Sequence, residues 1–220
     1  MSSELIPGPA GTLEVAFQRP TDSPAVALAL ICHPHPQFGG TMDNKVVQTL
    51  AKSFAELGFA TMRFNFRGVG KSEGSFDEGI GETEDAAAAL AWAQTHLGAS
   101  VPSGTALPLS GTALPLSGTA LPLVAAGFSF GCFVQTRLLS RSQPAQLVLI
   151  GPAVNRFEIP EVPKDTVVIH GEEDDVVPLA DVMNWARPQG LPVTVFPGTG
   201  HFFHGRLTEL KTVVKRFCRR

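Results

Sequence analysis

The sequence predicts an α/β fold, a doubly wound and mostly parallel sheet wrapped by helices, and three observations support this. Short apolar segments alternate with helical patterns along nearly the whole chain. Several of these segments are apolar at every position, which is typical of parallel strands that helices cover on both faces. The pattern Gly127-Phe128-Ser129-Phe130-Gly131 stands where one apolar segment gives way to a helical one. We expect the 220 residues to form a single domain over residues 1–220.

The first half of the chain alternates in this way. Apolar runs bounded by turn residues predict strands, and apolar positions at a spacing of three or four predict helices. The predicted elements are a weak edge strand (Leu13–Gln18), a central strand (Ala25–Cys32), a helix from Val46 to Leu57 closed by Gly58, a strand (Phe59–Phe66) and an alanine-rich helix that begins at Glu82 and ends near Leu97.

The second half repeats the pattern. The predicted elements are a strand (Leu121–Ala126), a helix through Val134, Leu138 and Leu139, strands at Leu147–Ile150 and Thr166–His170, a helix around Ala180–Ala186, a strand (Val193–Phe196) and a final helix with its apolar stripe from Leu207 to Phe217. Right-handed crossovers make such strands parallel, so their carboxyl ends meet at one edge of the sheet. We therefore look for the chemistry in the loops at that edge.

Residues 103–123 interrupt the alternation with three copies of Ser-Gly-Thr-Ala-Leu-Pro-Leu. A proline and a glycine in every copy exclude a continuous helix. The third copy must lead into the strand before Ser129, so we interpret the first two as an inserted loop. They enter at the amino end of that strand, and we expect them on the face opposite the chemistry, as a neutral duplication rather than an edge that pairs with another chain.

Composition excludes several classes of function. A net charge of −3 with 17% charged residues does not fit a nucleic-acid surface. The three cysteines form neither a disulfide framework nor a zinc spacing. The N-terminus lacks the features of a secretory signal, and no apolar run reaches the length of a membrane span. We expect a cytoplasmic protein without membrane or nucleic-acid partners, as a monomer or homodimer.

Ser129 is the candidate nucleophile. A serine on a tight strand-to-helix turn projects its oxygen above the sheet, and the flanking Gly127 and Gly131 leave room for the neighbouring strand and helix. Its position at a helix N-terminus also favours negative charge. A serine hydroxyl needs a base to remove its proton and an acid to orient the base, and in this turn type they follow in the order serine, acid, histidine.

The acid and the base are predicted from the loops after two later strands. Asp174 is the preferred acid in the turn 171–178, with Asp175 as the alternative, because it follows the strand-ending glycine by three residues. Glu172 and Glu173 fit solvated turn charges. His201 is the preferred base because it directly follows the turn Pro197–Gly200, whereas His204, one helical turn further, fits a packing role.

Attack on an acyl carbon creates an oxyanion that needs fixed N–H donors. The backbone N–H of Phe130 is one predicted donor. The second should come from the loop after the central strand, where Pro34 and Pro36 have no N–H, which leaves His35 as the first choice and Gln37 as the fallback.

Three other interpretations fail. Residues 70–72 read Gly-Lys-Ser like the end of a phosphate-binding loop, but Asn65 stands where its first glycine is required. The histidines of the His-Pro-His-Pro loop have no carboxylate at ligand spacing, so we expect no metal and no cofactor. Cys132 directly follows the strand-to-helix turn at residues 127–131, which we call the elbow, and fits a buried small hydrophobic residue.

Together these motifs resemble the α/β-hydrolase superfamily, and more closely a group of small bacterial serine hydrolases without a lid, distantly similar to dienelactone hydrolases. The resemblance rests on His33-Pro34-His35-Pro36 with Gly39-Gly40, the Asn65–Ser72 segment, the elbow at Ser129, Gly171-x-x-Asp174 and His201. It implies an α/β-hydrolase fold without a lid domain and a Ser129–Asp174–His201 triad. Dienelactone hydrolases proper use a cysteine where this chain has Ser129, so the resemblance does not extend to their substrates.

We therefore predict a serine hydrolase, carboxylesterase-like, that cleaves esters or related acyl bonds through an acyl-enzyme. The segment 151–165 is too short for a helical lid, so the pocket should be open and should favour small acyl groups. Its predicted substrate-binding residues are Gln37, Phe157, Ile159 and Phe202. A peptidase or amidase with the same triad, or a binding protein that keeps the fold, are the alternatives.

Overall fold

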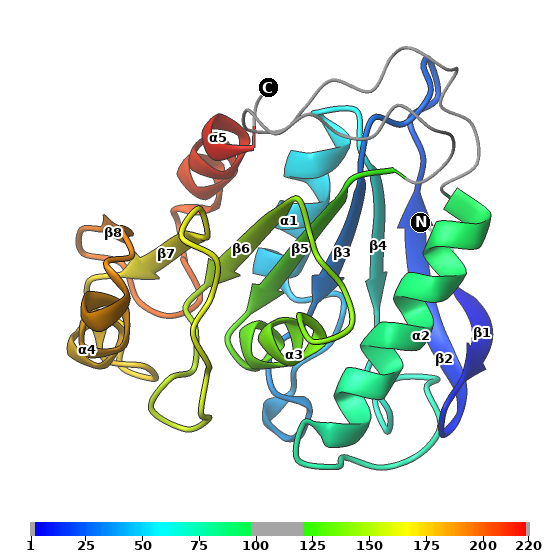
Figure 1. Ribbon diagram of the computed structural model, residues 1–220, viewed down its shortest axis with the longest axis horizontal. Helices are drawn as coiled ribbons and strands as arrows, with labels where there is room; N and C mark the ends of the chain where they lie inside the picture. Colours follow the sequence, from blue (N-terminus) through cyan, green and yellow to red (C-terminus); the bar gives the residue numbers. More distant parts are fainter. Residues whose placement is uncertain (1–2, 98–120, 219–220) are drawn as a thin grey trace.

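A computed structural model describes residues 3–97 and 121–218, which form an eight-stranded, mostly parallel sheet (Figure 1). The spatial order is β1-β2-β4-β3-β5-β6-β7-β8, and only β2 runs antiparallel to its neighbours. The strands are β1 (Glu4–Gly8), β2 (Gly11–Gln18), β3 (Leu28–Cys32), β4 (Ala60–Phe64), β5 (Leu123–Phe128), β6 (Gln146–Ile150), β7 (Val167–Gly171) and β8 (Val193–Phe196). The predicted fold class, a doubly wound and mostly parallel α/β sheet, is confirmed.

Helices cover both faces of the sheet (Figure 1). The helices are α1 (Lys45–Ala55), α2 (Ile80–Leu97), α3 (Phe130–Leu138), α4 (Leu179–Gln189) and α5 (Leu207–Phe217). On one face α1 packs against α5, and on the other α2 packs against α3 while α4 covers the end of the sheet. None of the described helices is both long enough and apolar enough to cross a bilayer.

The central strands are buried on both faces because their side chains alternate between two apolar cores. In β3, Leu28, Leu30 and Cys32 face the α2–α3 layer, whereas Ala29 and Ile31 face the α1–α5 layer. All five side chains are at most 1% exposed. This explains why the strand is apolar throughout instead of alternating with polar residues.

The prediction of an edge strand at Leu13–Gln18 is wrong. Leu13–Gln18 is part of β2, which is not an edge strand, because β1 pairs with its outer side. β1 is short and contains Pro7, so it gives no clear strand pattern. The tight connection from Gly8 to Gly11 turns the chain so that β1 and β2 pair antiparallel, and in this pairing Ile6 is only 2% exposed.

The repeat was expected to lie opposite the chemistry, but residues 98–120 lie outside the described part of the chain. Only the end of the third copy is described. There the carbonyl of Pro122 accepts a hydrogen bond of 2.9 Å from Leu28 N–H, and β5 begins at Leu123. This copy therefore leads into the strand before Ser129, as expected.

Candidate active site

Ser129 stands at the turn between β5 and α3 with φ 55° and ψ −114°, a backbone conformation that side-chain-bearing residues rarely adopt. Such strain costs about 1–3 kcal/mol and persists only where the surroundings enforce it. A Cβ at Gly127 would lie 2.4 Å from the carbonyl oxygen of Gly131, and a Cβ at Gly131 would lie 2.3 Å from that of Cys32. The two glycines thus allow the turn, as the sequence predicts.

The turn leaves the serine hydroxyl available for chemistry. The Ser129 backbone N–H donates to the carbonyl of Ile150 at 2.9 Å, whereas the side chain makes no capping bond to α3. Ser129 is 7% exposed, and that exposed surface lines a cavity at the carboxyl edge of the sheet.

Asp174 lies in the turn after β7, and its two carboxylate oxygens have different partners. Oδ1 accepts hydrogen bonds from the backbone N–H groups of Val176, at 3.0 Å, and Val177, at 2.7 Å. Oδ2 accepts from His201 Nδ1 at 2.7 Å. Although burial acts to raise the pKa of Asp174, the hydrogen bonds from His201 and Val177 lower it below its ordinary value. A buried, ionised carboxylate therefore faces the imidazole.

The competing acids lie differently. Asp174 is 5% exposed, whereas Glu172, Glu173 and Asp175 are exposed. Glu172 Oε2 accepts from the backbone N–H of Gly198 at 2.9 Å, so it braces the turn before His201. Among these four acids, Asp174 is the one that contacts His201.

His201 lies after β8, where the chain passes close to the end of β7. The absence of a side chain at Gly171 permits this approach, because a Cβ there would lie 2.2 Å from the carbonyl oxygen of Thr199. The Glu173 backbone N–H donates to the same oxygen at 3.0 Å. These contacts hold the two loops together and place His201, 3% exposed, against Asp174.

The imidazole also lies beside the elbow. Its Cε1 would be 3.2 Å from a Cβ at Gly151, the residue after Ile150, and its ring centroid lies 4.9 Å from that of Phe128. With the Nδ1 proton donated to Asp174, Nε2 is left unprotonated in the neutral ring.

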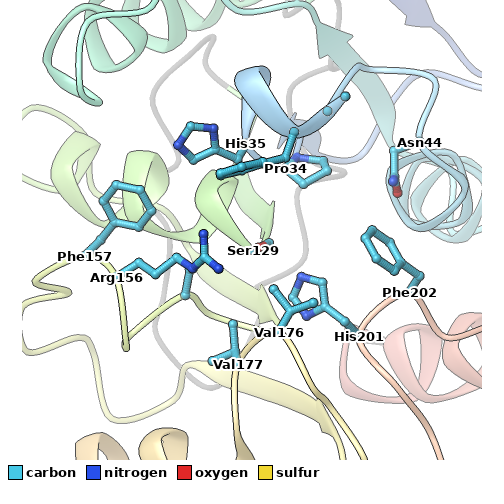
Figure 2. A pocket seen from close by; sticks show the side chains of 14 residues that line it. Pro34, His35, Asn44, Ser129, Arg156, Phe157, Val176, Val177, His201 and Phe202 are labelled. Atoms are coloured by element: carbon cyan, nitrogen blue, oxygen red, sulfur yellow. The ribbon is translucent and has the colours of Figure 1, made fainter.

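Ser129 and His201 line the same cavity, and Figure 2 shows them as neighbours there. No hydrogen bond between them is among the contacts of the described residues. Such bonds are often long in ligand-free enzymes and tighten when substrate binds. His204 is exposed, and its ring lies 5.9 Å from that of Phe202, outside the cavity.

The loop after β3 lies against the start of α3. A Cβ at Gly131 would lie 2.8 Å from the carbonyl oxygen of His33, so the segments that carry the N–H groups of His35 and Phe130 are in close contact. Neither N–H has an acceptor among the described residues. Gln37 N–H is occupied instead, because it donates to His35 Nδ1 at 3.2 Å.

His33 has a structural role that the sequence analysis missed. Its Nε2 accepts from Phe66 N–H at 3.1 Å, and its Nδ1 lies 2.6 Å from the carbonyl oxygen of Pro34, to which it donates. Burial lowers the pKa of His33 to about 3, so the ring is neutral. It ties the His-Pro loop to the end of β4.

Two other predicted positions are structural as well. The Asn65 side chain accepts from Met42 N–H at 2.8 Å and donates to Glu14 Oε2 at 2.9 Å, so it braces two loops. Cys132 Sγ donates to the carbonyls of Gly127, at 3.2 Å, and Ile150, at 3.3 Å. Burial raises the pKa of Cys132, which keeps it a thiol.

The cavity has a volume of about 280 Å³ and is lined mainly by apolar side chains (Figure 2). Its lining residues are Pro34, His35, Phe38, Gly39, Gly40, Asn44, Ser129, Ala153, Arg156, Phe157, Val176, Val177, His201 and Phe202. Phe157 and Phe202, both predicted to bind substrate, are among them. Arg156, Phe38 and Asn44 also line the cavity, although no sequence pattern pointed to them.

Gln37 and Ile159, which were also predicted to bind substrate, do not line this cavity. Gln37 is exposed in the 3₁₀ turn Pro36–Phe38 and does not line it. Beyond Phe157 the chain turns toward α4, where Trp185 Nε1 donates to the carbonyl of Ile159 at 3.0 Å. The Ile159 side chain is consequently buried in the core, at 7% exposure.

Comparisons with known proteins agree with this fold. A family model described as X-Pro dipeptidyl-peptidase (S15 family) matches residues 11–158, more than half of the chain. A solved α/β serine hydrolase homologue from Coxiella burnetii is 38% identical with a TM-score of 0.82, covering 98% of this chain and 96% of that one. A solved protein from Xanthomonas campestris, described as an α/β serine hydrolase without a lid, is 33% identical with a TM-score of 0.83, covering 98% and 92%.

A relative in sequence is an uncharacterized protein of Rickettsia prowazekii, 29% identical over 224 residues, which cover 96% of this chain and 85% of the relative. The family-model match includes Ser129 and ends before Asp174 and His201. The two solved structures extend the similarity over both of these positions.

Proposed function

The chain belongs to the α/β-hydrolase superfamily, in the family that the X-Pro dipeptidyl-peptidase (S15) model describes and among serine hydrolases without a lid, and from this we propose that it hydrolyses small carboxylic esters or related acyl bonds through an acyl-enzyme on Ser129. The observation that carries the proposal is the 2.7 Å bond between Asp174 and His201 in the cavity that a strained Ser129 also lines.

In this mechanism His201 Nε2 takes the Ser129 proton as Oγ attacks the acyl carbon. Asp174 holds the imidazole in the tautomer that can accept this proton, and stabilises the imidazolium that forms. The N–H groups of Phe130 and His35 are the proposed donors to the tetrahedral oxyanion, each worth about 10²–10³ in rate. The imidazolium then protonates the leaving group. Water, deprotonated by His201 in the same way, attacks the acyl-enzyme, which releases the acid and regenerates Ser129.

The size of the cavity supports short acyl groups as substrates. About 280 Å³ accommodates a small acyl chain, and the apolar walls from Phe157 and Phe202 favour burial of its methylene groups. The described segment between β6 and β7, residues 151–166, forms no helix that could act as a lid. Long acyl chains would therefore remain largely in water.

A peptidase acting on Xaa-Pro substrates is the second candidate, because the matching family model has that description. Such an enzyme must bind the α-ammonium group of its substrate. None of the described residues that line the cavity is acidic, whereas Arg156 brings a positive charge to it. The electrostatics of the site therefore favour acyl esters over dipeptidyl substrates.

The experiment is labelling with a fluorophosphonate, which reacts with activated serines. We expect wild-type protein to be labelled on the peptide that contains Ser129, and Ser129→Ala to remain unlabelled. Ser140→Ala, which removes an exposed serine in the turn after α3, is the matched control and should label like wild type. Failure of folded wild-type protein to react would indicate a binding protein, and labelling that survives Ser129→Ala would exclude Ser129 as the nucleophile.

A matched substrate set separates the two hydrolase candidates. Because an aryl ester is intrinsically more reactive than an anilide, the two substrates share one leaving group. We expect butyryl-4-nitroanilide to be hydrolysed at a higher kcat/KM than Ala-Pro-4-nitroanilide. A higher kcat/KM for Ala-Pro-4-nitroanilide, lost in Ser129→Ala, would favour the peptidase.

A further inference from the structure

Arg156 is the feature of the cavity that the proposed mechanism does not use. Its side chain is exposed and reaches into the cavity toward Ser129 (Figure 2). Its guanidinium carbon lies 5.4 Å from the centroid of the Phe38 ring, which is itself 72% exposed. None of the ion pairs between described residues includes Arg156. A guanidinium with five donors is thus available to a ligand.

The charge of Arg156 is not neutralised within the cavity. It is the only permanently charged side chain among the described residues that line it. The carboxylate behind His201, Asp174, already accepts from His201 and from two backbone N–H groups. The pKa of His35, on the opposite wall, is lowered by burial first and then by the positive charge of Arg156, although Glu78 acts in the opposite direction.

The backbone fixes where this arginine begins. The N–H groups of Arg156 and Phe157 both donate to the carbonyl of Ala153 at 3.1 Å, which forms a tight turn. The adjacent Asn155 side chain donates to the carbonyl of Val176 at 3.0 Å, in the loop that holds Asp174. The turn is therefore tied to the acid loop, and Phe38 offers an aromatic face against which the guanidinium packs.

We propose that Arg156 binds a carboxylate of the substrate, so that the enzyme prefers short acyl esters that carry an anionic end, such as monoesters of small dicarboxylic acids. The inference rests on the proposed function. Arginine binds a carboxylate through two parallel hydrogen bonds, which selects both charge and orientation. The carboxylate at Arg156 would direct the other end of a short chain toward Ser129.

Two fluorophosphonates that differ only at the end of a short alkyl chain test this, one ending in a carboxylate and the other in a carboxamide of nearly the same shape. The measured quantity is the ratio of their rates of labelling Ser129, followed by intact mass. We expect wild type to react with the carboxylate probe about 10- to 100-fold faster, the effect of a charge-assisted hydrogen-bonded pair. Arg156→Gln should bring the ratio close to one, and 0.5 M salt should reduce it in wild type.

Arg137→Gln is the matched control, because Arg137 is also exposed and lies over a phenylalanine ring, Phe133, at 5.6 Å, but does not line the cavity. It should keep the wild-type ratio. A wild-type ratio near one with both probes reacting, or a high ratio that persists in Arg156→Gln, would overturn the inference about Arg156. Either result would leave the proposed hydrolase function unaffected. Reaction with neither probe would overturn the proposed function itself.

Discussion

Replacing Asp174 with asparagine changes one atom and should nearly abolish hydrolysis. The two backbone N–H groups on Oδ1 decide how the new amide is oriented. If the amide oxygen keeps these two donors, the amide nitrogen faces His201 Nδ1. The flipped orientation would point the amide NH₂ at the N–H groups of Val176, which is partly buried, and Val177, which is buried, and leave both without acceptors, at about 1–3 kcal/mol for the buried one.

In the favoured orientation the amide NH₂ donates to His201 Nδ1, which then carries no proton. The proton moves to Nε2, so the imidazole can no longer accept the proton of Ser129. We expect kcat to fall by about 10⁴-fold, the size of the wrong-tautomer effect in a serine triad, which equals about 5.5 kcal/mol of transition-state stabilisation. At neutral pH the variant should lose only the stabilisation that comes from the carboxylate charge, because the two backbone hydrogen bonds remain.

The assay is the steady-state hydrolysis of a short ester by Asp174→Asn, with thermal unfolding as a check on the fold. Asp175→Asn is the matched control, because Asp175 is the exposed neighbour that the sequence left as the alternative. It should retain wild-type kcat. Retention of more than a tenth of kcat in Asp174→Asn, or a comparable loss in Asp175→Asn, would refute this reasoning.

Three further predictions concern the elbow, pH and the core. Gly131→Ala should slow labelling of Ser129 at least about 10-fold, because its Cβ would lie 2.3 Å from the Cys32 carbonyl oxygen and displace the elbow. Gly190→Ala, which strains a left-handed glycine (φ 64°) at the end of α4 but whose Cβ meets nothing, should leave labelling unchanged. The stability difference between wild type and Asp174→Asn in urea should be full above about pH 5. The pKa of Asp174 is about 3.9 in the unfolded chain and lower in the folded protein. The difference should therefore shrink as the pH falls below about 3.9 and disappear below the folded-state pKa, where the carboxylate is protonated. Leu30→Ala should lower the free energy of unfolding by about 2–5 kcal/mol while Ser129 still labels, and an unchanged value would contradict the core assignment.

The fold was predictable because the local signals agree with the global one. In β3 every side chain is buried, so the strand appears in the sequence as an uninterrupted apolar run. β1 could not be found in this way, because its short segment with Pro7 and mostly exposed residues depends on pairing with β2 rather than on its own pattern.

The residues of the candidate site could be predicted where each one follows the end of a parallel strand. Ser129, Asp174 and His201 follow the ends of β5, β7 and β8, and parallel topology brings such ends to one edge. In the sequence, Asp174 is favoured over its neighbours by its distance from Gly171 and by Val177-Pro178, which fix the loop behind it. What distinguishes it physically is burial with two backbone donors, which depends on three-dimensional contacts.

The cavity walls were less predictable. Phe157 and Ile159 lie two residues apart in an irregular loop, and only the first faces the cavity, because Trp185 holds the carbonyl of Ile159 near α4. Arg156 gives no signal in sequence, since a single surface arginine is common. Its proposed role depends on the cavity lining, among the described residues, having no acidic side chain to pair with it.

The most direct test of the account is to trap the covalent intermediate. Wild-type protein turning over a short ester is quenched with acid within milliseconds, digested and examined by mass spectrometry. We expect the mass of the acyl group on the peptide that contains Ser129, with accumulation in the burst that precedes steady state. Steady hydrolysis with the acyl group on another residue, or with a Ser129→Ala variant that turns over as fast as wild type, would contradict the account.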